Sequence, residues 1–154
     1  MMTNLENKHS ATFREKMAWV MTAALLIASG VFFHSLWNVS TSLEQVPKQA
    51  VLVMLVLFAI ILTIIAIAGA IVAALSNVSE ADEPMDERDK QITLKATHLG
   101  SIATGMVLVF TCLAYFYDAR SSDMLLGIIA ALILGHLVEY IFQIYLYRRK
   151  IYHG

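Results

Sequence analysis

The sequence has little charge and only one cysteine. Asp, Glu, Lys and Arg make up 15% of its 154 residues, whereas 58% are hydrophobic; soluble domains carry about 25% charged residues. Cys112 has no second cysteine to pair with, which excludes an intrachain disulfide and a cysteine-based metal site. The net charge of −1 leaves no basic surface of the kind that binds nucleic acid. These shortages favour an integral membrane protein.

Long hydrophobic runs make up most of the remaining sequence. A bilayer core about 30 Å thick is crossed by about 20 helical residues at 1.5 Å each. Four runs are long enough, so we predict a single all-α domain. We expect a four-transmembrane-helix bundle made of two antiparallel hairpins that contact the lipid bilayer. The predicted spans are 17–39, 50–75, 96–117 and 124–147.

An acidic connector at 76–95 separates the two predicted hairpins and is expected to include the start of the third helix. Nine of the eleven Lys and Arg residues lie in this connector, in a polar arm at 1–16 and in a basic tail at 148–154. Cytoplasmic segments of membrane proteins carry an excess of Lys and Arg. We therefore predict a multi-pass protein of the cell membrane with cytoplasmic N- and C-termini and with the third helix extended into the cytoplasm.

Small residues recur at steps of about four on three of the predicted helices. In lipid, helices associate by close packing, which ridges of small residues permit. Three such ridges exceed what one small bundle needs, so we expect a homo-oligomer or a membrane-protein partner. The ridge residues are Ala66, Ala70 and Ala74 on the second helix, Gly100 and Gly105 on the third, and Gly127, Ala131 and Gly135 on the fourth.

Glu139 is an acid within a predicted span, where an ionisable group is costly. It continues the ridge at 127–135 and should face a neighbouring helix, with His136 three residues earlier on nearly the same side. One interpretation is the proton-binding pair of a proton- or cation-coupled transporter. The other is a polar clasp that joins two helices by hydrogen bonds. The sequence favours the clasp and leaves both open.

Three histidines in the predicted spans raise the question of haem or a metal ion. At 1.5 Å per residue, His34, His98 and His136 lie at heights that differ by about 9 Å or more, whereas a metal needs its nitrogen ligands within about 2 Å. We therefore expect neither a cofactor nor a metal, with haem or metal binding as the weakest alternative. The sequence also lacks a recognisable nucleophile with its base and a phosphate-binding loop, so we expect no enzyme activity.

The connector contains a short charged motif at 86–89. Arg88 lies between acids and is suited to an ion pair with a carboxylate. The motif and two later residues resemble the D-E-R-D-x-x-I-x-x-x-A signature of a family of small, uncharacterised bacterial multi-pass membrane proteins. The matching residues are Asp86, Glu87, Arg88, Asp89, Ile92 and Ala96.

This resemblance implies a location in the bacterial inner membrane, with the motif at the cytoplasmic start of a helix. It implies no enzyme activity, because the family has no assigned chemistry. A partner-binding site and a packing latch at the cytoplasmic rim would use the same four charged residues, so both stay open. The expected role is non-enzymatic association with a second copy or with another membrane protein.

Overall fold

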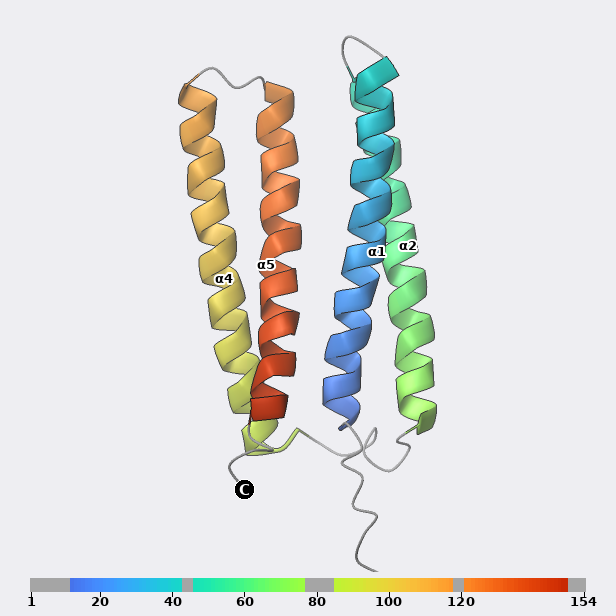
Figure 1. Ribbon diagram of the computed structural model, residues 1–154, viewed down its shortest axis with the longest axis vertical. Coiled ribbons are helices and arrows are strands. Elements are labelled where there is room, and N and C mark those ends of the chain that lie inside the picture. Colours follow the sequence, from blue (N-terminus) through green and yellow to red (C-terminus); the bar gives the residue numbers. More distant parts are fainter. Residues whose placement is uncertain (1–11, 43–45, 77–84, 118–120, 150–154) are drawn as a thin grey trace, which may run out of the picture.

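The described part of the protein consists of four long helices and short flanking segments. The computed structural model describes residues 12–42, 46–76, 85–117 and 121–149. Each helix is long and apolar enough to cross a membrane. The all-α class and the four candidate spans are confirmed, and they indicate a multi-pass membrane protein. The helices are α1 (Phe13–Ser42), α2 (Lys48–Ser76), α4 (Glu87–Phe116) and α5 (Ser121–Arg149) (Figure 1).

The helices extend beyond the predicted spans. α1 begins at Phe13, so the end of the predicted polar arm is helical, and α5 continues to Arg149 in the basic tail. α4 begins at Glu87, well before the predicted span at 96–117. Its N-cap is Asp86, whose carboxylate accepts a hydrogen bond from the Glu87 amide at 2.7 Å. Acids at this end stabilise a helix because they oppose its positive dipole end.

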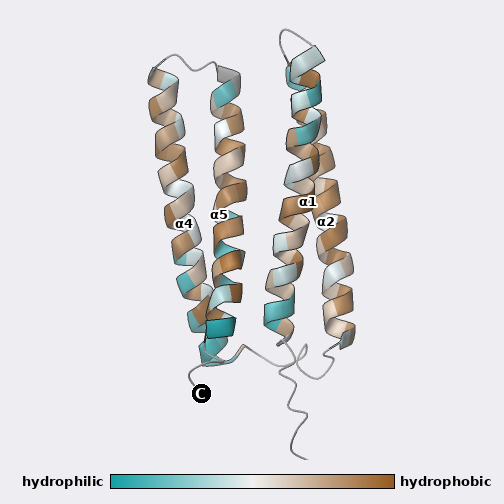
Figure 2. Cartoon of the chain, viewed as in Figure 1, coloured by the Kyte–Doolittle hydropathy of each residue, from teal (hydrophilic) through white to brown (hydrophobic). Residues whose placement is uncertain are grey.

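The helices form two pairs that stand side by side. α1 packs along α2, α4 packs along α5, and α1 also packs along α5. Figure 1 shows α1 and α5 between the two other helices. α1 has eight buried residues, whereas α2 has one, Ala73. The outer helices therefore leave many large apolar side chains exposed, as expected for helices surrounded by lipid. Figure 2 shows hydrophobic residues along most of the length of α2.

Side-chain contacts show that α4 and α5 run in opposite directions. Near one end Tyr147 bonds to Asp89, and further along Thr97 bonds to Glu139. As the residue number rises on α4, the number of its partner on α5 falls. Such a register is that of a helical hairpin.

The buried side of α1 follows a seven-residue repeat. Its positions alternate in steps of three and four, which places them on one side of a helix. The two hydroxyl groups among them bond within α1: Thr22 donates to the Ala18 carbonyl at 2.8 Å, and Ser29 donates to the Leu26 carbonyl at 3.3 Å. These small side chains leave room for neighbouring helices. The repeat consists of Glu15, Ala18, Thr22, Leu25, Ser29 and Phe32.

Glycines on α4 and α5 allow a close approach of the two backbones. A Cβ atom added to Gly100 would lie 2.8 Å from the Gly135 oxygen and 2.9 Å from the Glu139 Cβ. A Cβ atom added to Gly135 would collide with the Thr104 hydroxyl. Neither position has room for a larger side chain, so glycine is required for this distance between the helices.

The other predicted ridge residues differ in their surroundings. Gly127 lies against Thr111 of α4, and Ala131 is fully buried. A Cβ atom added to Gly105 would meet no atom of a neighbouring helix within 4 Å, so Gly105 is not part of a close contact between helices. On α2, Gly69 lies against Val20 of α1. Beside it, the predicted ridge of Ala66, Ala70 and Ala74 is half-buried.

Gly100 and Gly105 form a matched pair for testing this packing, because both lie on α4. Replacement of either glycine by alanine gains up to about 1 kcal/mol of helix propensity. Gly100→Ala also overpacks the contact, at a cost of about 1 to 3 kcal/mol. We expect Gly100→Ala to be less stable than Gly105→Ala when the free energy of unfolding is measured in mixed micelles. Equal stability of the two variants would contradict the close approach.

Candidate functional site

Polar side chains from three helices meet at one end of the molecule. Arg148 Nε of α5 donates a hydrogen bond to Glu15 Oε1 of α1 at 3.1 Å. The Tyr147 hydroxyl donates to Asp89 Oδ1 of α4 at 3.0 Å. Asp89 Oδ2 also lies 3.6 Å from Arg14 Nε of α1. These five residues, named the rim cluster here, join the α1–α2 pair to the α4–α5 pair.

Glu15 is the most buried charged residue of the rim cluster. Its side chain is 7% exposed, whereas that of Arg148 is 62% exposed. Removing a carboxylate from water costs several kcal/mol unless a partner compensates for the loss. Arg148 supplies this partner, and its guanidinium carbon lies 5.2 Å from the centre of the Trp19 ring, within cation–π range. The pair is thus sheltered on the Glu15 side and accessible on the Arg148 side.

Adjacent residues serve different neighbours in the rim cluster. Successive residues on a helix point about 100° apart. Arg14 therefore reaches α4 while Glu15 reaches α5. In the same way Tyr147 reaches α4 and Arg148 reaches α1. The adjacent pairs Arg14–Glu15 and Tyr147–Arg148, together with Asp89, thus connect α1, α4 and α5.

Glu15 is not identified by hydropathy, which assigns it to the polar arm. The available signal was the seven-residue repeat of α1, because Glu15 precedes Ala18 and Thr22 by steps of three and seven. Extending that repeat by one step places a carboxylate on the buried side of the helix. A buried carboxylate then requires a cation, and the basic tail supplies one.

The four residues of the charged motif have different surroundings. Asp86 caps α4, and Asp89 belongs to the rim cluster. Glu87 Oε2 lies 3.7 Å from Lys90 Nζ in an exposed pair. Arg88 is exposed and belongs to none of the ion pairs within the described ranges. The two aspartates thus act in helix capping and packing, whereas Arg88 stays accessible.

Glu139 and His136 lie together at the contact of α4 with α5. The Thr97 hydroxyl donates a hydrogen bond to Glu139 Oε1 at 2.7 Å. His136 Nδ1 lies 3.4 Å from Glu139 Oε2. The Glu139 side chain is 17% exposed, and that of His136 is 58% exposed. The carboxylate thus has one partner on each of the two helices.

Thr97 was not among the predicted partners of Glu139, although a pattern in the sequence points to it. Thr97, Thr104 and Thr111 are seven residues apart on α4, and each faces α5. Thr104 and Thr111 donate their hydroxyl protons to carbonyls four residues earlier on α4, at 3.0 and 2.9 Å. Thr97 instead donates across to α5, where Glu139 provides an acceptor.

The remaining histidines lie apart from this pair. On α1, His34 Nε2 is 3.2 Å from the Asn38 amide nitrogen. His98 is exposed on α4, as is the thiol-bearing residue Cys112. Within the described residues, no group of three His, Cys, Asp or Glu side chains is arranged to hold a metal ion.

Comparison of the chain with known protein families, with curated proteins and with solved structures finds no match.

The Glu15–Arg148 pair can be tested by a double-mutant cycle. Arg148→Gln leaves a buried carboxylate without its cation, so we expect a loss of about 1 to 3 kcal/mol. This is below the 3 to 5 kcal/mol of a fully buried pair, because Arg148 is largely exposed. Addition of Glu15→Gln should restore part of the loss. The measurement is unfolding in mixed micelles.

The exposed Glu87 and Lys90 pair is the control for this cycle. Exposed pairs contribute about 0 to 1 kcal/mol, so the coupling between Glu87→Gln and Lys90→Gln should be small. The rim cluster would not hold the helix pairs together if the coupling between residues 15 and 148 were no larger than this control.

Proposed function

We propose that this chain is a non-enzymatic, multi-pass protein of the bacterial inner membrane that acts by associating with a second copy of itself through α2. The observation that carries the proposal is the hollow on the exposed surface of this helix, which is lined only by residues of α2. In α2 the only buried residue is Ala73, although α2 is the most hydrophobic of the four helices. A membrane-protein partner on the same surface is the alternative.

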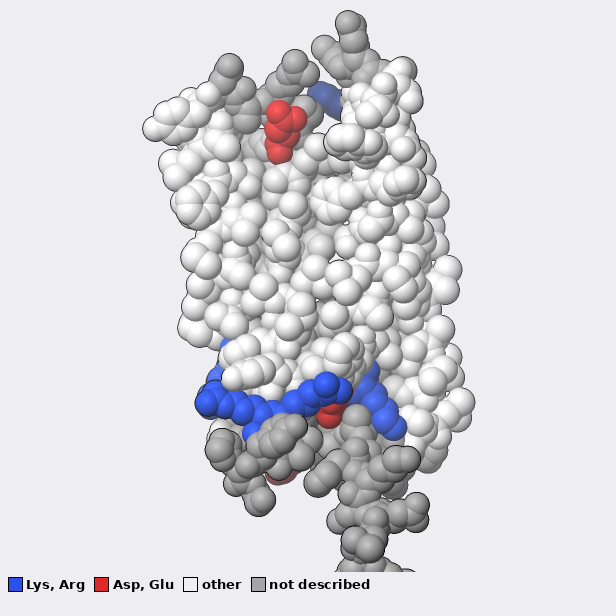
Figure 3. Space-filling model, in the orientation of Figure 1, with Lys and Arg blue, Asp and Glu red and all other residues white. Residues whose placement is uncertain are grey.

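The orientation that we propose places the rim cluster at the cytoplasmic side. Figure 3 shows Lys and Arg side chains gathered in a belt near one end of the molecule. The excess of Lys and Arg on cytoplasmic segments supports this assignment. Among the described Lys and Arg residues, only Lys48, the first residue of α2, lies at the end of the molecule opposite to the rim cluster. The others are Arg14, Lys16, Arg88, Lys90, Lys95, Arg148 and Arg149.

The proposed contact between two copies does not use the predicted ridges of small residues. Gly69 of α2 lies against α1, while Gly100 of α4 and Gly135 of α5 lie against each other. These contacts occur within one copy. The exposed surface that α2 offers to a second copy also carries large aliphatic side chains, including Leu52, Ile64 and Val72.

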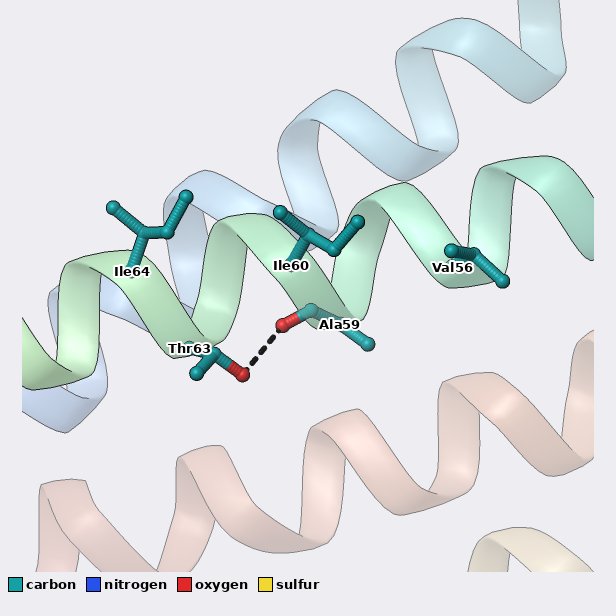
Figure 4. A pocket seen from close by; sticks show the side chains of 5 residues that line it. All are labelled: Val56, Ala59, Ile60, Thr63 and Ile64. Atoms are coloured by element: carbon teal, nitrogen blue, oxygen red, sulfur yellow. Dashed lines mark hydrogen bonds between the residues drawn. The ribbon is translucent and has the colours of Figure 1, made fainter.

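The exposed surface of α2 has a shape that suits a copy of itself. A shallow hollow of about 350 Å³ is lined by Val56, Ala59, Ile60, Thr63 and Ile64 (Figure 4). Thr63 donates its hydroxyl proton to the Ala59 carbonyl at 2.7 Å, so this surface carries no unpaired hydroxyl donor. Ala59 and Thr63 are small, and Ile60 and Ile64 form a ridge beside them. Under twofold symmetry each ridge can enter the hollow of the other copy.

Cysteine cross-linking tests the proposed contact. In a Cys112→Ser background we expect Ile64→Cys to form covalent dimers on mild oxidation in bilayers, because twofold symmetry brings equivalent positions near each other. Val109→Cys is the control, since Val109 of α4 is similarly exposed, at 58% against 61% for Ile64. Equal cross-linking of both variants, or none of either, would contradict association through α2.

The Thr97–Glu139–His136 group supports a second candidate function, proton- or cation-coupled transport. Glu139 has an imidazole within 3.4 Å of one carboxylate oxygen and a hydroxyl bonded to the other. Carboxylate and imidazole groups form proton relays in membrane transporters. The bond from Thr97, however, is also what a clasp between α4 and α5 requires.

Two substitutions separate the clasp from a proton site. Glu139→Gln retains an oxygen that accepts the Thr97 proton but cannot titrate, so a clasp should keep most of its stability. Thr97→Val removes the donor to a carboxylate, and we expect a loss of about 1.5 to 3 kcal/mol. Proton uptake into vesicles under an imposed potential supplies the second measurement. The transport candidate fails if wild type and Glu139→Gln take up protons alike.

A further inference from the structure

One exposed side of α4 changes abruptly from polar to apolar along its length. Arg88, Gln91, Lys95 and His98 follow one another at steps of three or four and are all exposed. The same spacing continues with apolar residues of high exposure, Ile102, Met106, Val109, Leu113 and Phe116. At 100° per residue, all nine positions fall within one sector about 80° wide. The change occurs between His98 and Ile102.

Lys95 and His98 have no partner within the described part of the chain. No hydrogen bond or ion pair joins either side chain to another described residue. They lie on the side of α4 away from the buried residues Ile92, Ala96 and Gly100. Whatever occupies this side must therefore meet a cation, an imidazole and the hydrocarbon side chains that follow.

The spacing of these groups matches the layers of a lipid leaflet. The headgroup region on each side of the hydrocarbon core is about 5 to 7 Å thick. Along the helix, His98 lies about 6 Å before Ile102, and Lys95 about 4.5 Å further. Lys95 thus lies at the outer edge of the headgroup region, where its long side chain can keep the ammonium group in water next to the phosphates. Both residues can thus reach a phosphate while Ile102 and Met106 contact an acyl chain.

We propose that Lys95 and His98 bind the phosphate of an anionic phospholipid whose acyl chain lies along Ile102 and Met106. Charge complementarity favours an anionic headgroup over a zwitterionic one, which presents its own cation to Lys95. The apolar continuation favours a lipid over an acidic protein segment, because the segment would leave Ile102 and Met106 uncovered. This inference goes beyond self-association and uses a different helix from the proposed dimer contact.

Native mass spectrometry of the full chain with phosphatidylglycerol or phosphatidylcholine tests this site. The wild type should bind phosphatidylglycerol more tightly than phosphatidylcholine. The attraction of one cation to an anionic membrane surface strengthens binding about fivefold. We therefore expect Lys95→Gln to reduce the preference for phosphatidylglycerol about fivefold. Lys95→Arg should retain it, and Lys95→Gln with His98→Gln should weaken phosphatidylglycerol binding further. Circular dichroism verifies that each variant is folded.

Lys48→Gln is the matched control, because Lys48 is an exposed cation at the opposite end of the molecule. It should leave the preference unchanged. Binding of phosphatidylglycerol by Lys95→Gln at wild-type strength would overturn the proposal, as would an equal loss in Lys48→Gln. Water-soluble glycerol phosphate should bind far more weakly than the lipid; equal binding would overturn the role of Ile102 and Met106. Cross-linking at Ile64 reports on self-association independently of all these outcomes.

Discussion

The contact between α1 and α5 is the constraint on which the rest of the structure depends. Within the described ranges it is the main contact between the α1–α2 pair and the α4–α5 pair. Lipid supplies no hydrophobic force that would hold two apolar pairs together. Close packing and the Glu15–Arg148 hydrogen bond must therefore do so. The short side chains of Ala18 and Thr22 permit this packing next to the ion pair.

Small residues lie at the contacts between the helices of one copy, so larger side chains make up its outer surface. Gly100 and Gly135 bring α4 and α5 together, and Gly69 brings α2 against α1. Bulky aliphatic side chains remain on the outer sides of α2 and α4. Lipid can solvate such a surface without cost, so its exposure alone requires no partner. The proposed contact between two copies therefore depends on the shape of α2 beside Ile60 and Ile64.

Hydropathy was sufficient to predict the four helices, because each must present about 20 apolar residues to the bilayer core. The placement of Glu139 beside His136 also agrees with helical spacing. Contacts between helices were harder to predict. Gly105 and Gly100 are both glycines in the same predicted span, but only Gly100 packs against α5. Which of the two faces α5 depends on the rotation of α4 about its own axis, which hydropathy does not give. Glu15 looks like part of a polar arm until its partner Arg148, far away in the sequence, is known.

The polar-to-apolar change on α4 also bears on the depth of Glu139. If the hydrocarbon core begins between His98 and Ile102, then Thr97 lies at the headgroup boundary, and so does Glu139, which it contacts at 2.7 Å. The predicted span at 124–147 would instead place this region of α5 near the bilayer centre. The residues from Tyr140 to Tyr147 include three tyrosines and Gln143, a composition typical of a membrane interface. A carboxylate at that level is close to the water on the rim-cluster side of the bilayer.

Such a depth changes the chemistry expected of Glu139. Near the interface a carboxylate retains some hydration, so its cost is below that of a charge at the bilayer centre. A single hydrogen bond from Thr97 can then be enough to keep it between the helices. Proton exchange with the adjacent water would be direct, but transport would need further polar groups along the helices.

Beyond the level of Glu139 the α4–α5 contact continues through Gly135 with Thr104 and Gly127 with Thr111. The hydroxyls of both threonines bond to their own helix. Depth and contact chemistry thus both favour the clasp.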